Sequence, residues 1–362
     1  PNLKWEQTAQ TNIGWDLGFF DGRLNIGGDF YYKKTTDLFT NVDVSPINGI
    51  TSYIMNNGDM LNKGFSISLN GYPVKTKNFR WYMSTYYSVN LNKVQTDDAR
   101  NYNLNDYLNG TAVVSGQPIS TFYSYKFLGL NPQNGAPMFD DWEDRWHLLQ
   151  GKTLDEVVPM ILVNSGTRDP KFSGDLNNTF TYKNWSLSLN FSYSLGSKVR
   201  LFEMYGPIIN GISAAANVRE EFLDRWQVPG DEKYTVYPLI ISPSSPDYEH
   251  YRLHYSAPQR AVGPNSGVPA FANNVWQMYD DSDLRVVSGN YLKLQSLSFS
   301  YRLNDRLLRK TPFTQLSISF NTHNCFTISA KELRGQDPSQ AGFADAGLSI
   351  RPSYTIGLNV SF

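Results

Sequence analysis

The stretch that decides the fold runs Trp185-Ser186-Leu187-Ser188-Leu189-Asn190-Phe191-Ser192-Tyr193-Ser194-Leu195. Every odd-numbered position is apolar or aromatic, and every even-numbered position is a serine or an asparagine. Because successive side chains of a β-strand point to opposite faces, this strand has one apolar and one polar face. At about 3.3 Å per residue it is long enough to cross a bilayer at a tilt.

The end of the chain repeats this pattern. Tyr354, Ile356, Leu358, Val360 and the terminal Phe362 share one face of a predicted strand. Such strands are typical of a transmembrane antiparallel up-and-down β-barrel in the outer membrane of a gram-negative bacterium. Phe362 resembles the assembly signal that the barrel insertase reads, and this likeness predicts a periplasmic C-terminus.

Composition agrees with a barrel and excludes other classes. Charged residues make up only 18% of the 362 residues and aromatic residues 14%, which suits strands with a lipid face and aromatic girdles at both membrane interfaces. A net charge of −1 gives no basic footprint for nucleic acid, and one cysteine allows no internal disulfide. No apolar run approaches the roughly 20 residues of a membrane helix. The aromatic content alone does not separate a barrel from a soluble β-sandwich, which is also rich in aromatic residues.

The same alternation predicts eleven strands. Asp21-Gly22 forms a tight hairpin turn between the first two. The apolar phase shifts between Leu294 and Leu297, which predicts a β-bulge. The segment 135–140 is included only because an up-and-down barrel requires a strand of that direction. The predicted strands cover about 4–20, 23–40, 60–73, 78–95, 119–130, 135–140, 171–182, 185–195, 291–303, 313–327 and 351–362.

The predicted connections alternate between short turns and long loops, as a membrane barrel requires. The short ones are 21–22, 74–77, 131–134, 184 and 304–312. The long ones, which face outward and carry recognition, are 41–58, 96–117, 141–170, 200–289 and 328–349. The loop at 200–289 is too long for a simple connector. A helix is predicted in it from Ala214 to Trp226, stopped by Val228-Pro229-Gly230.

Several segments resemble the C-terminal half of SusC/RagA-type TonB-dependent transporters. The resemblance covers nearly the whole chain outside the long loops. The segments that carry it are Pro1–Glu6, Tyr31–Leu38, Gly58–Gly64, Gly116–Ile119 with Phe122–Tyr125, Asp169–Gly174 with Asn178–Asn184, Tyr291–Leu294 and Asn321–Phe326.

This resemblance implies an outer-membrane importer with no enzymatic activity. It implies a 22-stranded barrel, of which residues 1–362 would be the C-terminal part, and a SusD-type surface lipoprotein as lid. Uptake of oligosaccharides, or of peptides in some members, would be driven by TonB. Because the chain starts at Pro1 without an initiator methionine or a signal peptide, we expect the plug domain, the TonB-contacting segment and the signal peptide upstream.

Two other classes stay open at this stage. A passive porin or a barrel enzyme has similar strands, so only the family motifs speak against it. A soluble glycan-binding β-sandwich is disfavoured by the strand lengths and by the C-terminal pattern. Glycan is preferred over peptide as the cargo, because the resemblance implies it more often.

Ligand-contacting residues are predicted in the longest loop. Aromatic side chains next to carboxylates can stack on a sugar face and bind its hydroxyl groups, and this combination occurs at Trp226, Trp276, Tyr279, Asp280 and Asp281. The alternative is that these aromatic residues anchor the packing of the loop.

Two further sets of residues are candidates for a site. Tyr82, Tyr86 and Asn90 are expected to line the barrel lumen, which is polar in any barrel. Asp140, Asp141 and Asp144 carry carboxylates that could bind Ca²⁺. Because they lack the spaced pattern of a calcium loop, the favoured interpretation is a solvated acidic loop, and no cofactor is expected.

Overall fold

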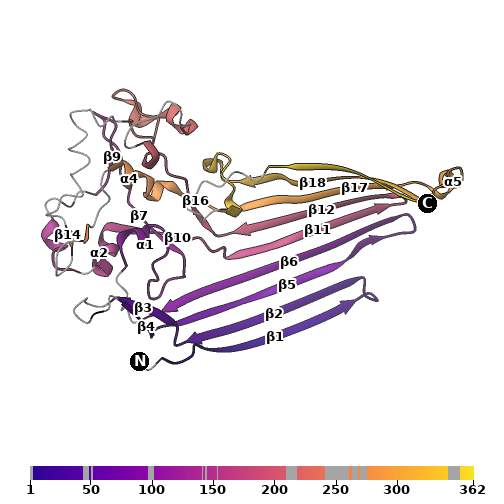
Figure 1. The fold of residues 1–362 in the computed structure, drawn as a ribbon, viewed down its shortest axis with the longest axis horizontal. Coiled ribbons are helices and arrows are strands. Elements are labelled where there is room, and N and C mark those ends of the chain that lie inside the picture. The colour runs from indigo at the N-terminus through magenta and orange to yellow at the C-terminus, as the bar shows by residue number, and fades with distance from the viewer. Residues whose placement is uncertain are drawn as a thin grey trace.

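The dominant element of the computed structural model is a large antiparallel sheet (Figure 1). The structure describes residues 3–43, 49, 52–96, 102–140, 142, 145–152, 154–208, 218–240, 261–262, 268–269, 275–340 and 351–362. Within these residues the sheet has nine strands in the order β1-β2-β5-β6-β11-β12-β17-β18-β19. The strands are β1 (Gln7–Phe19), β2 (Leu24–Thr36), β5 (Asp59–Lys75), β6 (Phe79–Gln95), β11 (Phe172–Tyr182), β12 (Trp185–Leu195), β17 (Tyr291–Arg302), β18 (Gln315–Ser329) and β19 (Ser353–Ser361).

The connections between these strands are short at one end of the sheet and long at the other (Figure 1). The short ones are 20–23, 76–78, 183–184 and 303–314, and we call their end the turn end. In the first of them Phe20, Asp21 and Gly22 all have positive φ (55°, 52° and 78°), a backbone that Asp-Gly adopts readily. The described residues of the long connections 37–58, 96–171, 196–290 and 330–352 lie at the opposite end, the loop end.

The strand register brings like side chains together on each face. One row across the sheet reads Phe180, Leu187, Phe299, Phe320 and Ile356. Many large apolar side chains of this face are open to the surroundings, among them Ile356, which is 76% exposed. An exposed apolar surface of this extent is typical of contact with lipid, so the predicted apolar face is confirmed.

The opposite face is polar and carries its own hydrogen bonds. The adjacent row reads Thr179, Ser188, Ser298, Asn321 and Thr355. The Thr179 and Ser188 hydroxyls lie 3.1 Å apart, and the Ser298 hydroxyl donates to Asn321 Oδ1 over 2.7 Å. The small side chains of this face therefore satisfy one another across the strands.

Strand irregularities lie where the apolar phase changes. The pairing of β17 with β18 shifts between Leu294 and Ser296, which confirms the predicted bulge. A second shift, in the pairing of β5 with β6, lies between Gly71 and Val74. Each bulge returns the following apolar residues to the apolar face.

Two predicted strands are wrong. Residues 119–130 and 135–140 do not join the large sheet, because β6 pairs directly with β11. Instead β7 (Thr121–Tyr125) pairs with β10 (Leu162–Thr167), and β8 (Gly129–Leu130) with β9 (Pro137–Met138). The physical reason is that all five residues of β7 are buried, so both of its faces need protein around them. Without these two segments, successive strands of the large sheet still run in alternating directions, because β6 and β11 pair antiparallel.

The predicted helix at 214–226 is also wrong in its described part. Residues 214–217 lie outside the described residues, and a short 3-10 turn, Glu220–Asp224, follows them. Phe222 and Trp226 are both buried, so loop packing rather than a long amphipathic helix satisfies their apolar surface.

The remaining elements are short, and most of them lie at the loop end (Figure 1). No helix within the described residues is long and apolar enough to span a membrane. The remaining strand pairs are β3 (Phe39–Asp43) with β4 (Ser52–Asn56), β13 (Lys198–Arg200) with β16 (Val286–Ser288), and β14 (Ala261–Val262) with β15 (Val268–Pro269). The α-helices are α1 (Leu104–Leu108), α2 (Leu154–Ile161), α4 (Val275–Asp280) and α5 (Asp305–Leu308). The other 3-10 turns are Trp146–Leu148, Gly206–Ile208, Asp231–Lys233, Asp283–Arg285, Lys331–Leu333 and Pro338–Gln340.

Candidate functional site in the loop body

The two longest connections fold together into one unit. We call the described residues of 96–171 and 196–290 the loop body. Its core takes buried side chains from both connections, for example Tyr107 and Tyr125 from the first and Tyr205, Trp276 and Tyr279 from the second. Tyr205 and Tyr279 meet edge to face with their ring centroids 5.5 Å apart. The loop end of the sheet therefore carries a packed structure rather than separate loops.

Asp280 fixes the path of the second connection. Its carboxylate, only 2% exposed, accepts hydrogen bonds from the backbone N–H groups of Met204, Tyr205 and Gly206 over 2.9, 2.8 and 2.9 Å. Buried N–H groups need such partners. One side chain at the end of α4 thus satisfies three donors that lie more than seventy residues earlier in the chain.

Arg200 joins the two connections. Its Nη2 donates to the carbonyl oxygens of Leu108 and Tyr123 over 3.0 and 2.9 Å and to Ser124 Oγ over 3.1 Å. Its Nη1 donates to the Ser282 carbonyl over 3.4 Å. A planar guanidinium with five donors is suited to holding several carbonyl groups at once. Arg200 therefore ties β13 to α1, to β7 and to the turn after α4.

The structure places the predicted ligand-contacting residues mainly inside the loop body. Trp226, Trp276, Tyr279 and Asp280 are all buried. Trp276 Nε1 donates to the Leu239 carbonyl over 2.9 Å, and Trp226 Nε1 to Glu232 Oε2 over 3.3 Å. Buried side chains offer no surface to cargo in this conformation, so the alternative interpretation as packing anchors describes these four residues.

Asp281, the fifth of these residues, is half-buried, and its carbonyl accepts the backbone N–H of Tyr125 over 3.2 Å. Burial raises the pKa of Asp281 to about 7, with nearby Arg200 opposing the rise. Burial likewise raises the pKa of Asp280 to about 6, opposed by Arg285 and by the three N–H donors. Both carboxyl groups therefore hold protons more tightly in the folded loop body than in an unfolded chain.

These pKa values predict a pH dependence of the loop body. A carboxyl group whose pKa is raised on folding stabilises the fold at low pH, and this stabilisation is lost as the pH rises through the folded-state pKa. We expect the loop body to lose roughly 1–2 kcal/mol of local stability between pH 5.5 and 7.5. Amide hydrogen exchange of residues 204–206, corrected for intrinsic rates, should show greater protection at pH 5.5. Protection that is equal or greater at pH 7.5 would contradict these assignments.

An open hollow on the loop end was not predicted from sequence. This polar hollow has a volume of about 530 Å³ and is lined by Leu223, Asp224, Arg225, Gln227, Asp231, Tyr234, Thr235, Val236, Tyr237 and Arg334. Tyr234 is 91% exposed, and Arg334 pairs with Asp224 over 3.4 Å. An exposed aromatic ring among charged groups of both signs can stack on a ligand and bind its polar groups.

The predicted lumen residues lie on the polar face of β6. Tyr82, Tyr86 and Asn90 stand at positions that pair with Thr179, Asp175 and Gly64 respectively. The Tyr31 hydroxyl crosses Gly64 and donates to Asn90 Oδ1 over 2.8 Å. A Cβ at Gly64 would lie only 2.7 Å from this hydroxyl, so the glycine makes room for the crossing. Lining of a transport path by these residues stays a prediction.

The candidate calcium loop is only partly described. Asp140 forms an ion pair with Arg145, whose guanidinium lies over the Trp142 ring at 4.3 Å from the centroid. Asp141 and Asp144 lie outside the described residues. Among the residues that the structure does describe, no group of three or more His, Cys, Asp or Glu side chains could hold a metal ion.

The architecture defines the class of the protein. A sheet of antiparallel strands with one apolar face, short turns at one end and a folded loop body at the other is the wall of a transmembrane β-barrel. The chain belongs to the family of TonB-dependent receptor-like β-barrels, whose model matches residues 1–219. Proteins of this family lie in the outer membrane.

Named relatives agree with this assignment. TonB-dependent receptor P3 of Formosa agariphila is 25% identical over 100% of this chain and 34% of its own length. TonB-dependent receptor SusC of Bacteroides thetaiotaomicron is 30% identical over 58% of this chain and 21% of its own length. These proteins are receptors rather than enzymes. The chain spans about a third of the length of receptor P3.

A solved structure shows the same fold. The structure of the RagAB peptide transporter covers 100% of this chain with a TM-score of 0.71 at 21% identity, and the match takes up 36% of that chain. The likeness therefore extends to the loop body as well as to the sheet.

Proposed function

We propose that the chain forms the C-terminal part of the barrel of a TonB-dependent outer-membrane importer. The plug domain and the signal peptide would belong to other parts of the whole protein. The turn end and Phe362 would face the periplasm, and the loop body would face outward. The observation that carries this proposal is the loop body itself. Two long connections fold into one structure at the end where cargo would arrive.

The cargo is an oligosaccharide that binds in the polar hollow. The exposed ring of Tyr234 offers a stacking surface, and Asp224, Asp231, Arg225 and Arg334 supply donors and acceptors for hydroxyl groups. A peptide is the second candidate, because paired charges of both signs also suit a zwitterionic chain. A SusD-like surface lipoprotein would close over the loop body, and the TonB complex would supply the energy for release into the periplasm.

A cargo-binding variant tests this proposal. We expect Tyr234→Ala combined with Arg225→Gln to lower uptake about tenfold or more, because the loss of a stacked ring and a charged donor removes a few kcal/mol of binding. Uptake of labelled oligosaccharides and of labelled peptides would be measured in cells that express the whole protein. Tyr53→Ala, which removes an exposed ring of β4, is the matched control.

The energy source separates the importer from the porin alternative. Uptake by the importer should stop when the proton gradient is collapsed. Uptake that continues down a concentration gradient without this energy would contradict the proposal. Unchanged uptake in the double variant would show that the polar hollow is not the cargo site. The cargo is the class of labelled compound, oligosaccharide or peptide, whose uptake the double variant lowers.

A further inference from the structure

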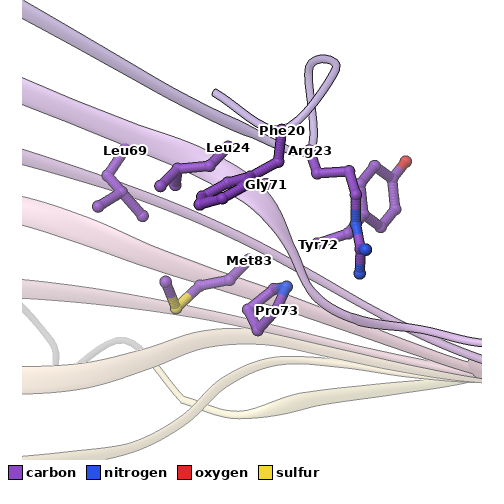
Figure 2. A pocket seen from close by; sticks show the side chains of 8 residues that line it. All are labelled: Phe20, Arg23, Leu24, Leu69, Gly71, Tyr72, Pro73 and Met83. Carbon is purple, nitrogen blue, oxygen red and sulfur yellow. The ribbon is translucent and has the colours of Figure 1, made fainter. Parts of the chain in front are cut away.

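The apolar face is not uniform, because a groove interrupts it near the turn end. The groove has a volume of about 440 Å³ and lies on β2, β5 and β6. Figure 2 shows the apolar side chains of Phe20, Leu24, Leu69 and Met83 gathered toward one end of the groove, and Arg23 with Tyr72 toward the other. A volume of this size is within the range of small-ligand pockets.

The groove exists because its floor has no side chain. Gly71 stands between Leu24 on β2 and Met83 on β6. A Cβ at Gly71 would lie 2.3 Å from the Arg23 carbonyl oxygen, so the close approach of the two strands excludes any other residue. The bulge between Gly71 and Val74 then lifts Pro73 out of the regular ladder.

The turn end of the sheet, where the groove lies, carries an excess of positive charge. The turn-end segments 20–23, 75–80, 182–185 and 302–314 hold nine of the 32 lysine and arginine residues but only two of the 33 aspartate and glutamate residues. We call these segments the basic collar. No ion pair between described residues involves the nine. An excess of this size at one end of the barrel favours a partner that carries negative charge.

Aromatic rings place part of the collar at the membrane interface. Lys75 Nζ lies over the Tyr72 ring at 5.2 Å from its centroid, and Lys183 Nζ over the Tyr182 ring at 5.4 Å. Tyr182 pairs with Trp185 on the apolar face. Tyr and Trp occupy the headgroup level of a bilayer. Lysine side chains that extend over such rings can therefore place their ammonium groups at the level of the lipid phosphates.

We propose that this groove binds one membrane lipid with a phosphate headgroup. An acyl chain lies between Leu24, Leu69 and Met83 over Gly71, and the phosphate binds Arg23 and Lys75 at the mouth. Arginine matches phosphate through paired N–H donors, and lysine adds a point charge. In the proposed orientation of the barrel, the turn end and its groove lie in the inner, periplasmic leaflet of the outer membrane. The lipid binding itself does not depend on this orientation.

Native mass spectrometry of the whole protein in mild detergent tests this proposal. The probe is phosphatidylglycerol, compared with diacylglycerol of the same chains and with inorganic phosphate as competitor. Arg23→Gln with Lys75→Gln removes the charges at the mouth, and Leu69→Trp fills the groove. Arg309→Gln with Lys310→Gln removes two charges of the basic collar that do not line the groove.

We expect the native protein to retain one phosphatidylglycerol after bulk lipid is stripped. Occupancy should fall about thirtyfold in the Arg23/Lys75 variant, because both positive charges that face the phosphate are lost. It should also fall in Leu69→Trp, stay unchanged in Arg309/Lys310, and be about tenfold lower for diacylglycerol. Equal retention in all variants, equal retention of diacylglycerol, or displacement by inorganic phosphate would overturn the proposal. Failure of energy-dependent uptake would refute the import function and leave this result intact.

Discussion

Replacing Leu189 with arginine is expected to destabilise the folded barrel by about 2–4 kcal/mol. Leu189 lies midway along β12 on the apolar face, where it pairs with Asn178 and Leu297. A guanidinium at that depth would have to leave water for hydrocarbon, and such substitutions cost most near the middle of the bilayer. Folding of the whole protein into liposomes over a denaturant series would measure the change.

The matched control is the next residue in the same strand. Asn190→Arg places the same charge at nearly the same depth but on the polar face, opposite Asn177 and Ser296. We expect it to change stability by less than about 1 kcal/mol, because water or polar groups reach that face. If both variants folded equally well, or if Asn190→Arg were the worse, the two faces would be assigned the wrong way round.

Replacing Asp280 with alanine is expected to open the loop body. The substitution leaves the N–H groups of Met204, Tyr205 and Gly206 without their acceptor in a buried setting. It also removes the carboxylate beside buried Arg285. Together these losses should cost about 3–5 kcal/mol of local stability. The measurement is hydrogen exchange of residues 200–208 and 275–285 in the whole protein at pH 7.5.

Asp231→Ala is the control for this second variant. Asp231 also accepts two backbone N–H groups, those of Gln227 and Val228, over 3.0 Å each, but at an exposed site. Because water can replace an exposed acceptor, we expect a loss of only about 1 kcal/mol. Exchange in the strands β11 and β12 should stay slow in both variants. Native protection of residues 204–206 in Asp280→Ala would show that the carboxylate does not hold this segment.

The large sheet is predictable from sequence because its signal is local. The alternation of apolar Leu187 with polar Ser186 and Ser188 is visible in the sequence itself. It marks a strand with one lipid-facing side without any knowledge of contacts to distant segments. The phase shift after Leu294 likewise marks a bulge that the structure contains. The segment 119–130, which contains Phe122, was wrongly predicted as a strand of the barrel wall. Its aromatic residues are dense enough for a strand, and it is one, but it is buried in the loop body instead of the barrel wall.

The loop body could not be predicted in the same way, because its contacts join distant segments. Trp276 and Asp280 look like ligand-binding residues in the sequence. Only the fold shows that both are buried, with Trp276 1% exposed and Asp280 2% exposed. Tyr234 gives no periodic signal, yet its ring is almost fully open. The role of Arg200 depends on carbonyl groups at Leu108 and Tyr123, about ninety and seventy-seven residues away. No local pattern encodes such distances.

The intact mass of the protein extracted in detergent from its native outer membrane tests the central claim most directly. The claim is that this chain is one part of the barrel of a plugged importer. It predicts a mass roughly three times the 41.1 kDa of the chain, since the chain covers 34% of receptor P3. A mass near 41.1 kDa would mean a small self-contained protein and would contradict TonB-dependent import.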